Sequence, residues 1–208
     1  MSIGAPNIRP RSFQQANAKA IPPSGRSPEA IWHCAYDTQT YTDNSTTSLD
    51  FFTAVNTDKT LSNMEAAGQF PAPQVFSMYA ITCDVWAAAA GVSTSATTVG
   101  NANDIYLLLM VGRPSWLFTL QNKTYGRYPL ISLHSTGGPE AFVSSTVAAA
   151  SQQFARNMPH GGWNYNGSIT IPAQTSFQFN VIWHAAQDLT ANWLIRINFF
   201  GQLDRAVK

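Results

Sequence analysis

Two cysteines and four histidines are the side chains in this sequence best suited to nucleophilic or metal chemistry. His33 stands beside Cys34, and an imidazole next to a thiol can activate a nucleophile. Both lie in the apolar run AIWHCAY, which indicates a strand, and neighbouring side chains of a strand point to opposite faces. We therefore expect that these two side chains do not meet, and that Cys34 and Cys83 are buried free thiols.

Other catalytic and metal-binding patterns are missing from the sequence. No G-x-S-x-G motif is present, and the acids stand mostly singly in turns instead of forming a catalytic pair. No glycine pair is followed by the lysine of a phosphate-binding loop. The histidines lack H-x-x-x-H or H-x-H spacing, so only convergence of distant residues could bind a metal: His33, His134, His160 and His184. We predict that the chain is not an enzyme and has no catalytic residue, cofactor or metal.

Aromatic residues in loop-like contexts are the remaining candidates for a binding role. Trp116, Tyr125, Trp163 and Tyr165 could stack on sugar rings, but aromatic residues are also enriched where subunits pack together. We favour subunit packing and expect an interface made by Trp116, Phe154, Trp163 and Tyr165. Carbohydrate binding is the alternative.

Charge is scarce throughout the chain. Only 11% of its 208 residues are charged, against about 25% in an average soluble domain, while 45% are hydrophobic. A free monomer usually carries about 25–35% charged residues on its surface. We therefore expect other subunits to cover much of this surface. No apolar run approaches the ~18–20 residues of a membrane-spanning helix, and the N-terminus lacks the apolar region of a secretory signal.

Residues 1–29 differ from the rest of the chain. They contain five prolines and no hydrophobic periodicity, which predicts an extended arm that does not fold alone. The arm has four basic residues, and its only acid, Glu29, is the last residue, so residues 1–28 carry +4. Such an arm could bind a neighbouring subunit, the acidic head groups of an internal lipid membrane or the phosphates of a packaged genome. Its basic residues are Arg9, Arg11, Lys19 and Arg26.

From residue 30 onward, apolar residues recur with a period of two, which indicates β-strands. The clearest runs end the chain, where Phe177, Phe179 and Val181, and then Ile195 and Ile197, share one face of their strands. We expect about eight strands, separated by Gly, Pro, Asn and Ser turns, and therefore a sandwich or barrel. The runs lie at 30–36, 48–55, 74–86, 103–112, 115–121, 128–134, 167–173, 176–184 and 192–201.

Two segments, 74–86 and 144–159, have patterns of their own. In the run 74–86, strict alternation places the odd-numbered residues from Val75 to Val85 on one face and Phe76, Met78 and Ala80 on the other. Residues 144–159 have an alanine run and a terminal proline, which predict one short helix in the long loop at about 134–167.

Three segments also resemble a known family. The sequence at 58–81, DKTLSNMEAAGQFPAPQVFSMYAI, is similar to jelly-roll major capsid proteins of tailless, icosahedral, mostly membrane-containing prokaryotic viruses. The segments at 168–183 and 192–207 resemble the final two strands of those proteins. The matching residues are Leu61, Asn63, Met64, Gly68, Phe70, Pro71, Phe76, Ile171, Pro172, Phe177, Ile197, Gly201, Leu203 and Arg205.

This resemblance implies a single eight-stranded jelly roll over residues 30–208, although many of these relatives have two fused jelly rolls. It implies a structural virion protein of a bacteriophage, made in the host cytoplasm, that forms homo-oligomers and self-assembles into the icosahedral capsid. Its partners would be copies of itself and other capsid or vertex proteins. The family brings no catalytic or ligand-binding residues. The alternative is a carbohydrate- or receptor-binding jelly-roll module, such as a vertex spike or penton component.

Overall fold

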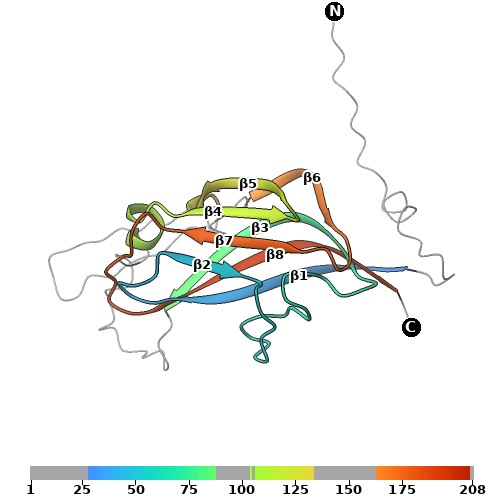
Figure 1. The fold of residues 1–208 in the computed structure, drawn as a ribbon, viewed down its shortest axis with the longest axis horizontal. Helices are drawn as coiled ribbons and strands as arrows, with labels where there is room; N and C mark the ends of the chain where they lie inside the picture. The colour runs from blue at the N-terminus through green and yellow to red at the C-terminus, as the bar shows by residue number, and fades with distance from the viewer. Residues whose placement is uncertain (1–27, 88–103, 105, 134–162, 207–208) are drawn as a thin grey trace, which may run out of the picture.

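The computed structural model describes residues 28–87, 104, 106–133 and 163–206 (Figure 1). In these residues, eight strands form two four-stranded antiparallel sheets, and two short helical turns flank strands β4 and β5. The expected all-β fold with eight strands is therefore confirmed. In chain order the elements are β1 (Pro28–Tyr41), β2 (Ser48–Phe51), β3 (Val75–Ala87), η1 (Leu107–Val111), β4 (Ser115–Leu120), β5 (Lys123–Pro129), η2 (Leu130–Leu133), β6 (Trp163–Ile171), β7 (Phe177–Ile182) and β8 (Trp193–Ala206).

The strand pairing is nested. Strand β4 pairs with β5, β3 with β6, β2 with β7 and β1 with β8. The first four strands therefore pair with the last four in reverse order. Further pairing of β8 with β3 and of β7 with β4 joins these pairs into sheets of order β1-β8-β3-β6 and β2-β7-β4-β5. Figure 1 shows the two sheets as layers, one lying over the other.

The core between the sheets is rich in aromatic rings. The expected alternation is confirmed in β7 and β8, where every second residue is buried. Phe199 of β8 connects the two sheets, because its ring centroid lies 5.5 Å from that of Phe118 and 5.8 Å from that of Phe179. Phe52 closes the cluster at 4.6 Å from Phe199. This packing determines which side chains of β8 point outward.

Strict alternation is wrong for β3. The pairing with β8 passes from Met78 to Ala80, so Tyr79 is an extra residue in the register. Such a β-bulge reverses the two faces of the strand beyond it. Met78 is buried before the bulge, whereas Ile81 and Cys83 are buried after it. In β3, even-numbered residues therefore face the core before the bulge, and odd-numbered residues face the core after it.

Two of the expected strands are helical turns. The apolar runs at 103–112 and 128–134 contain η1 and η2 instead, and the strand β5 lies at Lys123–Pro129, where we expected a turn. A short continuous apolar run does not separate strand from helix, and leucine favours helices. In β5 only Gly126 is buried, so this strand shows no apolar alternation. None of the helical turns in the described ranges is long enough to cross a membrane.

The expected domain boundary is close to the start of the fold. Strand β1 begins at Pro28, two residues before the expected boundary at residue 30, and Glu29 lies opposite Arg205 of β8. The arm before it, the expected helix at 144–159 and most of the long loop around that helix fall outside the described residues.

Candidate functional site

Five aromatic side chains of β1, β3 and β8 lie on the outward side of the β1-β8-β3-β6 sheet, and we call them the aromatic face. Residues Ala35 and Asp37 of β1 are buried, so the even-numbered residues of that strand point outward. In β8 the odd-numbered residues from Trp193 to Leu203 are buried, and its even-numbered residues therefore lie on the same outward side. The aromatic face consists of Trp32, Tyr36, Tyr79, Trp86 and Phe200.

Three of these rings gather where β1, β8 and the bulge of β3 lie side by side. Trp32 is 75% exposed and Phe200 is 42% exposed. The ring centroids of Trp32 and Tyr79 are 5.7 Å apart and tilted by 51°. Phe200 lies opposite Cys34 in the register, which makes it a diagonal neighbour of Trp32. Rings held this way by strands offer a large apolar contact at little entropic cost, as the central residues of protein interfaces do.

Arg196 occupies the other half of this face. Its guanidinium carbon lies 4.6 Å from the ring centroid of Tyr36 and 4.8 Å from that of Trp86. Its Nε donates a hydrogen bond of 3.0 Å to Thr38 Oγ1, and an Nη group donates to the carbonyl oxygen of Thr60. The charge is thus held against two aromatic rings and by two hydrogen bonds.

Between these two halves lies a network of neutral and acidic groups. Asn198 Nδ2 donates to Thr82 Oγ1 at 3.1 Å and to Asp84 Oδ2 at 2.7 Å, and Cys34 Sγ donates to Asn198 Oδ1 at 3.9 Å. Burial, with a smaller effect of the Asp84 carboxylate, raises the pKa of Cys34 to about 11, while Arg196 opposes the shift. The thiol is therefore protonated at neutral pH and is a poor nucleophile.

His33 points to the opposite side of β1 from Cys34, as expected. Its ring lies edge-on to Phe76, with centroids 6.2 Å apart. Cys83 is fully buried, which raises the pKa of its thiol strongly. Both cysteines are free, although Cys34 is only partly buried. No thiol–imidazole pair forms between His33 and Cys34.

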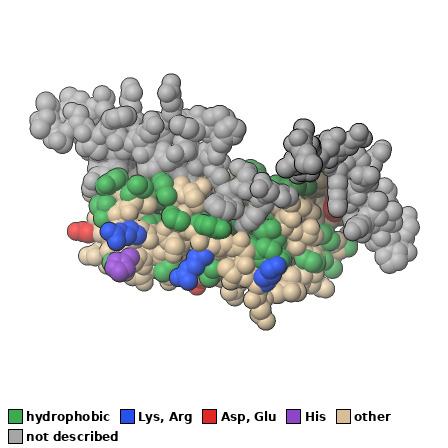
Figure 2. All heavy atoms as spheres, turned by 90° about the horizontal axis from the view of Figure 1, so that it is seen from above, with side chains coloured by type: hydrophobic (Ala, Val, Ile, Leu, Met, Phe, Trp, Pro, Cys, Tyr) green, Lys and Arg blue, Asp and Glu red, His purple; other side chains and the backbone are tan. Residues whose placement is uncertain are grey.

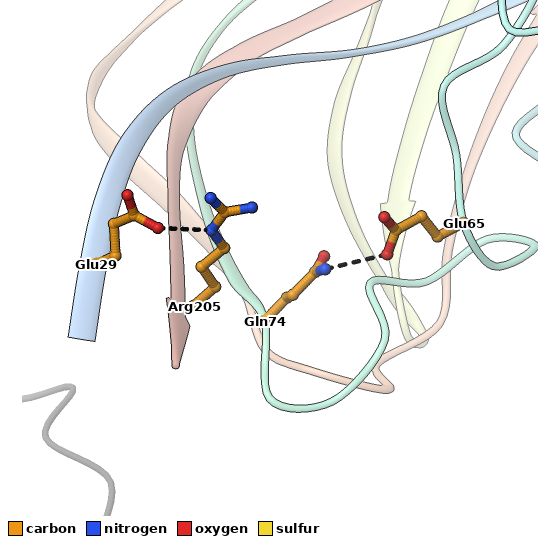
Figure 3. Close-up of polar contacts among 4 residues, drawn as sticks. All are labelled: Glu29, Glu65, Gln74 and Arg205. Atoms are coloured by element: carbon orange, nitrogen blue, oxygen red, sulfur yellow. Dashed lines mark hydrogen bonds and ion pairs between the residues drawn. The ribbon is translucent and has the colours of Figure 1, made fainter. Parts of the chain in front are cut away.

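His33 instead lines a cavity of about 120 Å³ where β1 begins and β8 ends. Figure 3 shows two polar pairs in this region: Arg205 Nε donates to Glu29 Oε2 at 2.8 Å, and Gln74 Nε2 donates to Glu65 Oε2 at 3.1 Å. Burial lowers the pKa of His33; the Glu65 carboxylate opposes this effect and Arg205 adds to it. The cavity is smaller than the ~300–1,000 Å³ that is typical of ligand pockets. The ion pair of Glu29 with Arg205 connects the start of β1 to the end of β8.

Trp116 does not belong to an exposed interface, and this expectation is wrong. It lies on β4 with 0% exposure, and its ring stacks on Phe179 at 5.7 Å. Its indole Nε1 donates to Ser132 Oγ at 3.1 Å. The indole faces the core because Trp116 shares the inward phase of its strand with Phe118 and Leu120.

The other expected site residues lie in strands or outside the described residues. Trp163 and Tyr165 lie in strand β6 and not in a loop. Tyr125 lies in β5, where Lys123 Nζ is 4.9 Å from its ring centroid. Phe154 and the basic arm residues Arg9, Arg11, Lys19 and Arg26 fall outside the described residues.

Sequence reasoning did not single out Trp32, Tyr79 and Phe200. The alternation of apolar residues could have indicated two of them. Phe200 is an apolar residue on the face of β8 that points away from the core, and Trp32 lies on the corresponding face of β1. Tyr79 could not be placed without knowing the bulge.

Comparisons with known proteins do not identify a family. No family model matches the chain, and neither a search of curated proteins nor a search of solved structures found a match. Within the part of the chain that the structure describes, no group of three His, Cys, Asp or Glu side chains could hold a metal ion.

Proposed function

We propose that the chain is a jelly-roll structural protein that assembles with copies of itself into the icosahedral shell of a virion. The nested pairing, with sheets of order β1-β8-β3-β6 and β2-β7-β4-β5, supports a jelly roll, in which eight strands form two sheets through two Greek keys. The resemblance at 58–81 and in the last two strands supports the viral assignment. Jelly rolls also occur in lectins, so the fold alone does not select between a shell protein and a sugar-binding module.

The aromatic face is the observation on which self-assembly depends. Trp32 is 75% exposed and Phe200 is 42% exposed, so two large apolar side chains of this face are open to a partner. Strands β1, β8 and β3 each have 13 or 14 residues, so together they present about 45 Å by 15 Å, or roughly 650 Å². A stable interface takes about 800 Å² from each partner. The aromatic face with its rim therefore approaches the area that one partner contributes to a stable contact.

The test measures the native mass of the purified full chain. The wild type is expected to run well above 22.7 kDa at micromolar concentration, and electron microscopy is expected to show regular assemblies. Trp32→Ser and Phe200→Ser each remove apolar area from the aromatic face. We expect both variants to shift the chain toward the monomer while the far-ultraviolet circular dichroism spectrum of the folded chain stays unchanged.

Ile182→Ser is the matched control, because Ile182 is 44% exposed on the other sheet. It is expected to assemble like the wild type. A wild type that stays monomeric, or a Trp32→Ser variant that assembles normally, would contradict the proposal. Selective binding to a glycan array by a monomeric chain would favour the carbohydrate-binding alternative instead.

A further inference from the structure

An open groove of about 520 Å³ lies between η1, the end of β5 and η2, away from the aromatic face. Its size falls within the ~300–1,000 Å³ of small-molecule sites. Two basic residues, Arg113 and Arg127, line it together with Ser115, and the rest of its wall is apolar. We call it the arginine groove, and its apolar wall consists of Leu109, Met110, Pro114, Tyr128, Pro129 and Ile131.

The two arginines have no acidic partner in the described ranges. Both side chains are exposed, and the ion pair recorded there joins Arg205 to Glu29, at the distant start of β1. Figure 2 looks down on the side of the molecule that carries β5 and shows basic and hydrophobic side chains side by side. The groove thus contains two arginines without an ion-pair partner in the described ranges, next to an apolar surface.

Backbone hydrogen bonds hold the walls of the groove in place. Gly112 N donates to Leu107 O at 2.8 Å, and His184 N donates to Gly112 O at 3.1 Å, which fixes η1 against the end of β7. Leu130 N donates to Pro114 O at 2.9 Å and fixes η2 against the start of β4. A site that is already formed loses little entropy when a ligand binds.

We infer that the arginine groove binds a small amphiphilic anion, namely an alkyl carboxylate. A guanidinium group presents paired N–H donors that match the two oxygens of a carboxylate, and the apolar wall would cover the alkyl chain. Neutral ligands would leave both charges unused. A second copy of this groove is a poor occupant, because two pairs of arginines would then face each other. The inference does not depend on self-assembly.

The test titrates decanoate into the full chain and follows binding by calorimetry and by NMR chemical shifts. Hexanoate has four fewer methylene groups, and each one lost is expected to weaken binding by up to about four-fold. Acetate tests the head group alone, and decyltrimethylammonium reverses the charge while keeping the chain. We expect acetate and the cation to bind at least ten-fold more weakly than decanoate.

Variants of the two arginines test the role of charge. Arg113→Gln and Arg127→Gln are each expected to weaken decanoate binding about three-fold, and the double variant about ten-fold. Lys123→Gln is the matched control, because it removes a cation of the same strand β5 outside the groove, and it is expected to change affinity less than two-fold.

Three results would overturn the inference. The first is the absence of decanoate binding at millimolar concentration, and the second is equal binding of the cationic amphiphile. The third is a change of native mass in the double variant without a change in decanoate affinity, which would show that the groove is a contact between subunits. Thermal unfolding of each variant checks that a loss of binding is not a loss of folding.

Discussion

Gly201 of β8 has no room for a larger side chain. A Cβ atom at this position would overlap the carbonyl oxygen of Ser77 and would lie 2.9 Å from its carbonyl carbon and 2.7 Å from the ring of Phe76. Gly201 pairs with Met78, next to the bulge of β3. The obstacle is therefore the backbone of the neighbouring strand, which a change of side-chain conformation cannot remove.

We expect Gly201→Ala to lower the free energy of unfolding by about 3–5 kcal/mol. Overpacking of a core costs about 1–3 kcal/mol, and moving β3 away from β8 weakens two or so hydrogen bonds of about 1 kcal/mol each. For a chain of this size, each kcal/mol corresponds to about 2–4 °C in the melting temperature. The melting temperature is therefore expected to fall by about 6–20 °C, as measured by circular dichroism.

Gly126 of β5 provides the comparison, because a Cβ atom there would meet a side chain instead of the backbone. The nearest atoms belong to the six-membered ring of Trp116. Trp116→Phe is therefore expected to recover part of the stability lost in Gly126→Ala, whereas Phe76→Leu is expected not to rescue Gly201→Ala. A Gly201→Ala protein that melts within about 2 °C of the wild type would refute the reasoning.

Two predictions concern titration. Because burial lowers the pKa of His33 below 6.5, the unfolded chain takes up this proton first. The free energy of unfolding should therefore fall as the pH drops below about 6.5, and urea denaturation should show a smaller fall for His33→Gln than for the exposed control His184→Gln. Since the pKa of Cys34 is about 11 against an ordinary 9.0, its thiolate fraction is about 100-fold lower. Alkylation by iodoacetamide at pH 8 should be slower than that of a cysteine peptide by this factor, and an equal rate would contradict the assigned environment.

The residues that carry the capsid-protein resemblance have physical roles in this fold. Asn63 Nδ2 donates to Cys34 O at 2.7 Å, and Tyr36 N donates to Asn63 Oδ1 at 2.8 Å, so the side chain of Asn63 covers the open edge of β1. Exposed strand edges invite unwanted pairing, and this cover limits it. Gly201 allows β3 and β8 to approach. Both roles are consistent with a jelly roll but do not require a viral protein.

For several strands, the sequence was enough to predict which residues face the core and which face outward. The alternation in β7 and β8 identified Phe177, Phe179, Ile195 and Ile197 as core residues, because the period of a strand is fixed by backbone geometry. The same reasoning failed in β3 beyond Tyr79, since one inserted residue reverses the phase. It also failed in β5, where the neighbour Trp116 fills the space above Gly126 and no apolar alternation is needed.

The sequence by itself determined that this is a strand-rich chain with little charge, because composition and period are local properties. The tertiary structure decided which outward residues meet. Trp32, Tyr79 and Phe200 come from three strands far apart in the chain, and their proximity depends on strand order, register and one bulge. The two arginines of the groove likewise belong to the segment between η1 and β4 and to the edge strand β5, which only the folded backbone brings to a common cavity.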